Sequence, residues 1–185
     1  MPLLVKILLP GFLLLFLNNT ISLESLLPQG PVVPQNLIVP KGNKLVFHVY
    51  AKGVQVYKCA HDVTDTTKFV WLFVTPLATL YADSGCSKAV GKHYTGPAWE
   101  SMDGSKVVGM KIQQADAPDS GSIPWLLVRS VSTTGSGIFS NVTFIQRVNT
   151  RGGKAPSLAT ADKDHKGLEA NVPYRAEYYF YVKEP

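Results

Sequence analysis

Apolar and polar residues alternate along most of the chain after residue 44. The alternation covers 45–50 and again 54–57, which predicts two strands with a turn near Lys52-Gly53. The same period of two recurs in later segments at 69–74, 78–81, 107–112, 125–131, 142–148 and 174–182. Clusters of Gly, Pro, Asp and Ser separate these segments, where βαβ units would have helices. The pattern therefore predicts an all-β fold, a β-sandwich or a β-barrel of about 8–10 mostly antiparallel strands.

The dipeptide Asp103-Gly104 predicts a tight hairpin, because both residues tolerate the positive φ values of a type I′ turn. Pairing outward from a two-residue turn sets Trp99 opposite Val108 and leaves Glu100 on the other face. Trp99 is then expected to face the core or a pocket.

The last expected strand carries aromatic residues on both faces. One face has Tyr174, Ala176, Tyr178, Phe180 and Val182, and the other has Arg175, Glu177, Tyr179, Tyr181 and Lys183. Such a strand is either covered on both sides or has a polar face that lines a cavity with tyrosine hydroxyls.

The N-terminal residues have the order of a secretory signal peptide, with Lys6 before an apolar block at 7–17 and small residues after it. The block is shorter than the ~20 apolar residues that a spanning helix needs, so we expect no permanent membrane anchor. We expect cleavage after Ser22, which divides the chain into a signal peptide (1–22), an extended Pro-rich arm (23–43) and a single β-domain (44–185), secreted from the cell.

Charge excludes one class of partner. The chain has 18 Lys and Arg against 13 Asp and Glu, a net charge of +5, but the cations are scattered singly. Nucleic-acid binding normally needs a concentrated basic patch, so we expect none.

In a secreted protein the only two cysteines, Cys59 and Cys86, are expected to form a disulfide. The sequon at 141–143 predicts a glycan on Asn141 in a eukaryotic host.

Several segments resemble the domain of unknown function 3455 family. They are GVQVYKC at 53–59, ATLY at 78–81, GKHYTGPAWE at 91–100, DGSKV at 103–107, IPWLL at 123–127, VTFIQRVNT at 142–150, GG at 152–153, AP at 155–156, VPY at 172–174 and YYFY at 178–181. The resemblance spans about residues 40 to 182. It implies a secreted protein and assigns no activity. Relatives carry a cysteine shortly after Pro156 where this chain has 157–160 SLAT, a departure that leaves Cys59 only Cys86 as a partner.

Common reaction motifs are absent from the sequence, and we expect no cofactor and no metal. The segment 135–140 has Ser140 where a dinucleotide-binding G-x-G-x-x-G motif needs its third glycine. No G-x-S-x-G elbow occurs, which disfavours a serine hydrolase. The four histidines are not spaced as zinc ligands, although small polar clusters occur at 61–65 and 162–165.

The segment from His93 to Lys106 collects most of the reactive side chains. His93 and Glu100, with Asp103, are the candidate acid and base, because an imidazole beside a carboxylate can move protons near neutral pH. The alternative is structural: a histidine at a strand end, a tryptophan in the core and a glutamate paired with a lysine. The same segment offers three candidate ligand-binding residues, Tyr94, Trp99 and Lys106.

Arg147 lies in an otherwise apolar strand, where a guanidinium needs a partner. That partner is either Glu177 on the last strand or an anionic small molecule in a cavity; Tyr179 is a further candidate contact.

The sequence supports two functions. The first is a secreted domain that binds a small molecule, a glycan or a protein, and the second is a cofactor-free isomerase, cyclase or hydrolase that uses His93 and Glu100.

Overall fold

The protein is a closed eight-stranded antiparallel barrel, which confirms the all-β prediction. The computed structural model describes residues 29–185, so the expected signal peptide and cleavage site lie outside the described residues. Strands follow one another around the barrel in chain order, and β1 closes it by pairing with β8. The strands are β1 (Asn43–His61), β2 (Phe69–Tyr81), β3 (Ala89–Tyr94), β4 (Ala98–Ser101), β5 (Lys106–Ala115), β6 (Trp125–Thr134), β7 (Val142–Gly152) and β8 (Glu169–Lys183).

The described part also has two short 3-10 turns, η2 (Gln35–Leu37) and η3 (Leu158–Thr160). Neither they nor any other described segment forms a helix of the length and apolarity that a bilayer crossing demands.

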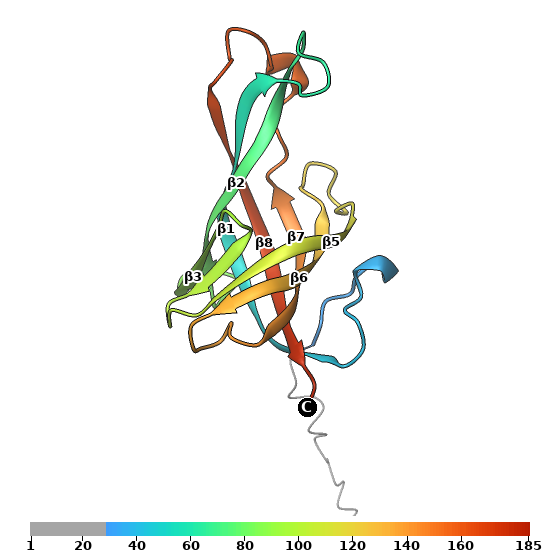
Figure 1. Ribbon diagram of the computed structural model, residues 1–185, viewed down its shortest axis with the longest axis vertical. Helices are drawn as coiled ribbons and strands as arrows, with labels where there is room; N and C mark the ends of the chain where they lie inside the picture. The colour runs from blue at the N-terminus through green and yellow to red at the C-terminus, as the bar shows by residue number, and fades with distance from the viewer. Residues whose placement is uncertain (1–28) are drawn as a thin grey trace, which may run out of the picture.

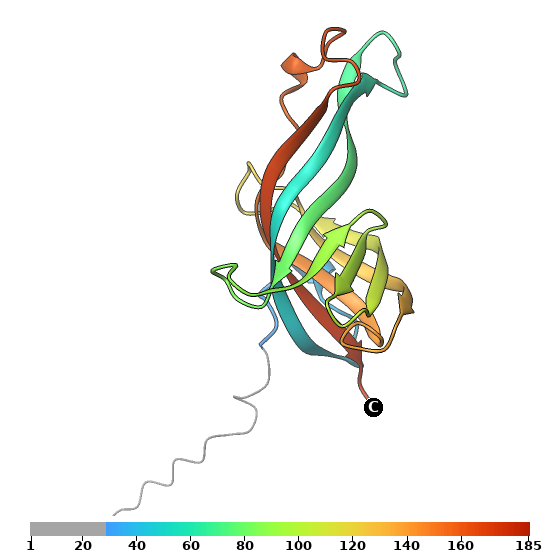
Figure 2. The same ribbon diagram turned by 90° about the vertical axis from the view of Figure 1, so that its left-hand side faces the viewer.

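The three longest strands are β1, β8 and β2, with 19, 15 and 13 residues. Figure 1 shows β1, β2 and β8 running together past the barrel rim as a three-stranded extension, and Figure 2 shows the same extension from the side. Its cause lies in the pairing: β2 pairs with β3 only over 78–81, whereas it pairs with β1 over its whole length. One end of the barrel is therefore overhung by the extension.

The turn expected near Lys52-Gly53 is wrong, because β1 runs straight through it. Gly53 lies opposite Ala78, and a Cβ built on it would stand 2.0 Å from the carbonyl oxygen of Leu77. Glycine is required there because the β2 backbone comes too close for any side chain.

The core fills the barrel with aromatic and aliphatic side chains. Its largest fully buried members include Trp99, Tyr178, Phe139 and Phe180. A second cluster lies outside the barrel wall, where Tyr179, Tyr181 and Val148 pack against Val33 and Val39 of the N-terminal arm. A hydrogen bond holds the arm against β7, since Gln146 Nε2 donates to the carbonyl oxygen of Leu37 at 2.7 Å. The last strand is thus covered on both faces at Tyr179 and Tyr181, as the first of the two expected arrangements has it, while Arg175 on the outer face stays exposed.

The hairpin at Asp103-Gly104 forms with a different register. Trp99 pairs with Val107 instead of Val108, because the loop has three residues, 102–104. Gly104 has φ +84° and its N–H donates to Ser101 O, while the Ser101 N–H donates to Ser105 O. This is the turn-plus-bulge geometry of three-residue hairpins. The expectation that Trp99 faces inward is still met, since its side chain is 2% exposed.

The expected disulfide is also wrong: both cysteines are free. Cys59 lies opposite Trp71 in β2, whereas Cys86 follows Tyr81, at the other end of that strand. Ten residues of strand separate these ends by about 30 Å at ~3.3 Å per residue. A disulfide needs Cα atoms within about 7 Å, so the barrel keeps the two thiols apart.

Candidate site at the barrel mouth

A pocket of about 310 Å³ opens at the barrel mouth, under the extension. Its walls come from β1, β2, the β3–β4 hairpin, β6 and β7. The lining residues are Gln55, Phe73, Val74, Pro76, His93, Thr95, Gly96, Pro97, Leu126 and Arg147. The lining is mostly apolar, with one charged side chain and no carboxylate, a composition typical of small-molecule sites.

Arg147 supplies that charge. The side chain is half-buried, and its Nε and Nη2 both donate to the carbonyl oxygen of Pro124, at 3.2 and 2.8 Å. A guanidinium carries five N–H donors, so most of its capacity is left for another partner. The ion pairs among residues 29–185 are Lys68–Asp65, Lys92–Glu100 and His165–Asp162, and none includes Arg147. The expected carboxylate partner, Glu177, instead accepts from Asn149 Nδ2 and the Tyr179 hydroxyl on the outer wall.

Further unused donors lie beside Arg147 inside the barrel. Tyr178 is opposite it in the β7–β8 register. Within the described residues, Gln55 Nε2 and the hydroxyls of Tyr174 and Tyr178 are buried close to one another and to Arg147, and no group outside this cluster gives them a hydrogen bond. Burial raises the pKa of Tyr178, and the positive charge of Arg147 opposes that shift. Buried donors usually have well-placed partners, and this cluster has only its own members, so a bound acceptor would complete it.

His93 is a buried, neutral member of the pocket wall. Its Nδ1 lies 2.9 Å from Ala98 O, which fixes the proton on that nitrogen. Burial lowers the pKa of His93 to about 3; the Ala98 contact opposes the shift and the charge of Arg147 adds to it. A group with this pKa is a poor general base at neutral pH, because so little driving force remains for taking a proton.

Glu100 does not meet His93. In the β3–β4 register His93 pairs with Trp99 on the inner face, and Lys92 pairs with Glu100 on the outer face. Glu100 accepts from the Tyr94 hydroxyl and lies 3.1 Å from Lys92 Nζ. The hydrogen bond from Tyr94 is the main cause that lowers the pKa of Glu100, and Lys92 and the nearby Lys106 act in the same direction. The structure therefore separates the two side chains that the acid–base hypothesis needs together.

Asp103 holds loops in place. It accepts from the N–H and hydroxyl of Ser105 and from the N–H of Ile138 in the β6–β7 loop. These bonds, above all the one from the Ser105 hydroxyl, lower the pKa of Asp103 to about 2. Of the other expected ligand contacts, Trp99 is in the core, Tyr94 and Lys106 surround Glu100 on the outer wall, and Tyr179 packs under the N-terminal arm.

Two sequence expectations concern surface loops. Asn141 is exposed at the residue before β7, which leaves its glycosylation a prediction. In the polar clusters at 61–65 and 162–165, the aspartates accept hydrogen bonds from backbone N–H groups of their own turns. Among residues 29–185, no three His, Cys, Asp or Glu side chains lie close enough together to hold a metal ion.

Sequence reasoning found Arg147 and His93 but missed Gln55, Tyr174 and Tyr178 as pocket neighbours. The inward face of the last strand pointed to the two tyrosines. Gln55 had a weaker signal, a polar residue on the face that the core occupies.

A family model described as "Protein of unknown function (DUF3455)" matches residues 40–182. That range contains all eight strands except the last residue of β8, and every residue of the pocket. No curated protein and no solved structure matches the chain.

Proposed function

We propose that this chain, which belongs to the DUF3455 family, is a secreted binding protein that holds a small carboxylate with an apolar body in the barrel mouth. The observation that carries the proposal is Arg147, a guanidinium in a pocket of about 310 Å³ with no carboxylate in its lining. An arginine binds a carboxylate through two parallel N–H bonds, and the low dielectric of a barrel interior strengthens them.

The other groups of the pocket fit the same ligand. Gln55 Nε2 in the lining can donate to an anion, and the Tyr178 hydroxyl, opposite Arg147 in the register, is a further donor behind it. Phe73, Pro97 and Leu126 offer apolar surface to the rest of the molecule. The volume lies at the low end of small-molecule sites, which favours a compact ligand with one ring or a short chain.

Secretion is part of the proposal and rests on the apolar block at 7–17 with its flanking residues. Cleavage of that block would leave the arm and the barrel as the mature protein. N-terminal sequencing of protein recovered from medium tests this part separately.

Titration calorimetry with benzoate, cinnamate and octanoate tests the binding function. Cinnamamide serves as the uncharged match of cinnamate. We expect at least one carboxylate to bind, and Arg147→Gln to weaken binding by at least about tenfold, or ~1.4 kcal/mol. Arg147→Lys should weaken it less, because a lysine keeps the charge but not the paired geometry.

Arg129→Gln is the matched control, since it removes one arginine from an exposed position on the neighbouring strand β6. Equal binding by native protein and Arg147→Gln would overturn the proposal, as would binding of cinnamamide as tight as that of cinnamate. Absence of binding by all three carboxylates would do the same.

A further inference from the structure

A row of cations crosses the outer wall of the barrel. Arg175 on β8 lies directly opposite Lys52 of β1 on one side and Arg151 of β7 on the other. All three side chains are exposed. Neighbouring strands are about 4.8 Å apart, so three positive charges project from adjacent positions of one sheet face.

This row is only partly compensated by the described part of the protein, where the charge of Arg151 is close enough to Asp119 to help lower the pKa of that carboxyl group. The three ion pairs of residues 29–185 involve none of these cations. Like charges directly opposite each other on neighbouring strands destabilise a sheet. A feature that costs stability and is only partly compensated within the fold points to a role in binding.

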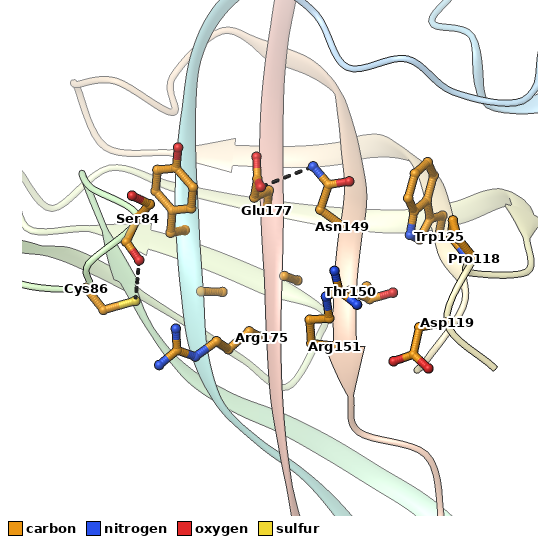
Figure 3. Close-up of a pocket in the computed structure, with 13 residues that line it drawn as sticks. Ser84, Cys86, Pro118, Asp119, Trp125, Asn149, Thr150, Arg151, Arg175 and Glu177 are labelled. Atoms are coloured by element: carbon orange, nitrogen blue, oxygen red, sulfur yellow. Dashed lines mark hydrogen bonds between the residues drawn. The ribbon is translucent and has the colours of Figure 1, made fainter. Parts of the chain in front are cut away.

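The row forms the floor of a trough. Figure 3 shows Arg175 and Arg151 between two loops, with Ser84 and Cys86 on one side and Pro118 and Asp119 on the other. The trough has a volume of about 390 Å³, and a second hollow of about 390 Å³ adjoins it at Lys52. The cations therefore line a concave surface with walls and are not simply spread over a convex one.

The other groups of the trough define what it can hold. Tyr50 and Trp125 line it and offer flat apolar ring faces. The carboxylates of Glu177 and Asp119 also line it and can accept hydrogen bonds from hydroxyl groups. A ligand that satisfies all of these has acid groups, hydroxyl groups and apolar ring faces together. We propose that the trough binds an acidic polysaccharide, a chain of uronate sugars, at a site separate from the barrel mouth.

The two carboxylates disfavour nucleic acid as the occupant. Nucleic acid carries a negative charge on every unit and binds best to surfaces of one sign. Glu177 is held in the lining by hydrogen bonds from Asn149 and Tyr179, and its charge there would repel a phosphate. A uronate chain has hydroxyl groups beside each carboxylate and can place them there instead.

Binding of a short oligogalacturonate, measured by titration calorimetry at low and at physiological salt, tests the proposal. Its fully methyl-esterified form is the uncharged match. We expect Arg151→Gln with Arg175→Gln to weaken binding at least about tenfold. Binding of the native protein should fall as salt rises, because exposed charges are screened.

The control variant is Arg129→Gln with Lys163→Gln, which removes the same charge from exposed positions elsewhere. We expect it to bind as the native protein does. The inference is overturned if native protein does not bind the oligogalacturonate, or if both double variants bind equally. It is overturned as well if the esterified chain or a single-stranded DNA of similar length binds as tightly.

Discussion

His93 stacks on Trp99 inside the barrel, with ring centroids 4.4 Å apart and an angle of 13° between the planes. The two residues are direct partners across β3 and β4, and Tyr178 packs against both rings. The imidazole therefore belongs to the aromatic core at the inner end of the pocket, and its neutral state is part of what holds that core together. Its titration has consequences for stability.

We expect the protein to lose stability as the pH falls from about 6.5 toward 4.5. The pKa of His93 is lowered to about 3 in the folded protein, whereas an unfolded histidine titrates near 6.5. Between these values the unfolded chain binds the extra proton, so acid favours unfolding, by at most ~1.4 kcal/mol per pH unit. Denaturant unfolding at several pH values measures the slope, and His93→Phe should flatten it. NMR titration of the imidazoles is an independent check: a near-neutral pKa for all four histidines would contradict this.

Asp103→Asn should lower the melting temperature at pH 7. In the native protein the Ile138 N–H donates to Asp103 Oδ2. In the variant an amide NH₂ takes the place of that oxygen and cannot accept the hydrogen bond. The pKa of Asp103 is lowered to about 2, so the stability it contributes is present above its unfolded pKa of 3.8 and is lost as the pH falls toward 2. The difference in melting temperature between native and variant should therefore shrink over that range. A constant difference from pH 7 to pH 2 would show that the carboxylate charge is not responsible.

Gly53→Ala is expected to destabilise the barrel strongly, by about 3 kcal/mol or more, because the new Cβ would overlap the β2 backbone. The overlap involves Leu77 O at 2.0 Å and the Cα of Ala78 at 2.5 Å, and backbone atoms cannot move aside as a flexible side chain can. Gly121→Ala is a suitable control, since its Cβ would meet nothing closer than 3.5 Å. Urea unfolding compares the two variants, and similar midpoints would mean that β1 and β2 are not so closely packed.

Both thiols should be free in purified protein. Cys86 is partly exposed and should react with a maleimide in the native state, whereas Cys59 is fully buried and should react only after unfolding. Peptide mapping of the labelled protein distinguishes the two. A native protein that takes up no label until it is reduced would restore the disulfide.

Asn141 should carry a glycan when the protein is made in a eukaryotic secretory host. The residue is exposed where the β6–β7 loop meets β7, and it begins the sequon that ends at Thr143. Mass spectrometry before and after glycosidase treatment measures the change, with Asn141→Gln as the reference. Identical masses in native and treated samples would rule the modification out in that host.

Alternation alone predicted the fold class and the inward face of the last strand, because side chains in a strand point to opposite faces in turn. It did not decide between sandwich and barrel, since closure depends on the pairing of β1 with β8, more than a hundred residues apart. The turn predicted at Gly53 was wrong because a glycine in a turn and a glycine packed against the backbone of a neighbouring strand have the same local sequence. The difference is a contact with Leu77 that the local pattern does not contain.

The candidate sites were predictable to different degrees. Arg147 was conspicuous as a charge in an apolar strand, but its hydrogen bonds go to a backbone carbonyl, which any residue can supply. His93 and Glu100 are close in sequence, which made them a candidate pair. In the register of β3 and β4, however, His93 is opposite Trp99 on the inner face, and Glu100, the next residue, points to the outer face. The row of Lys52, Arg175 and Arg151 was read as scattered charge, since only the strand register brings these residues together.

The three-stranded extension has a consequence for local dynamics. Within the described residues no strand pairs with the outer edge of β2 before Ala78, so every second amide there faces solvent, while β1 is hydrogen-bonded on both sides by β2 and β8. Amide hydrogens should therefore exchange in a gradient, fast along the free edge of β2 and slow along β1. Phe73 and Val74 lie on that edge and also line the barrel mouth. Opening of the edge is thus a route by which the pocket can widen while the strands that close the barrel stay in place.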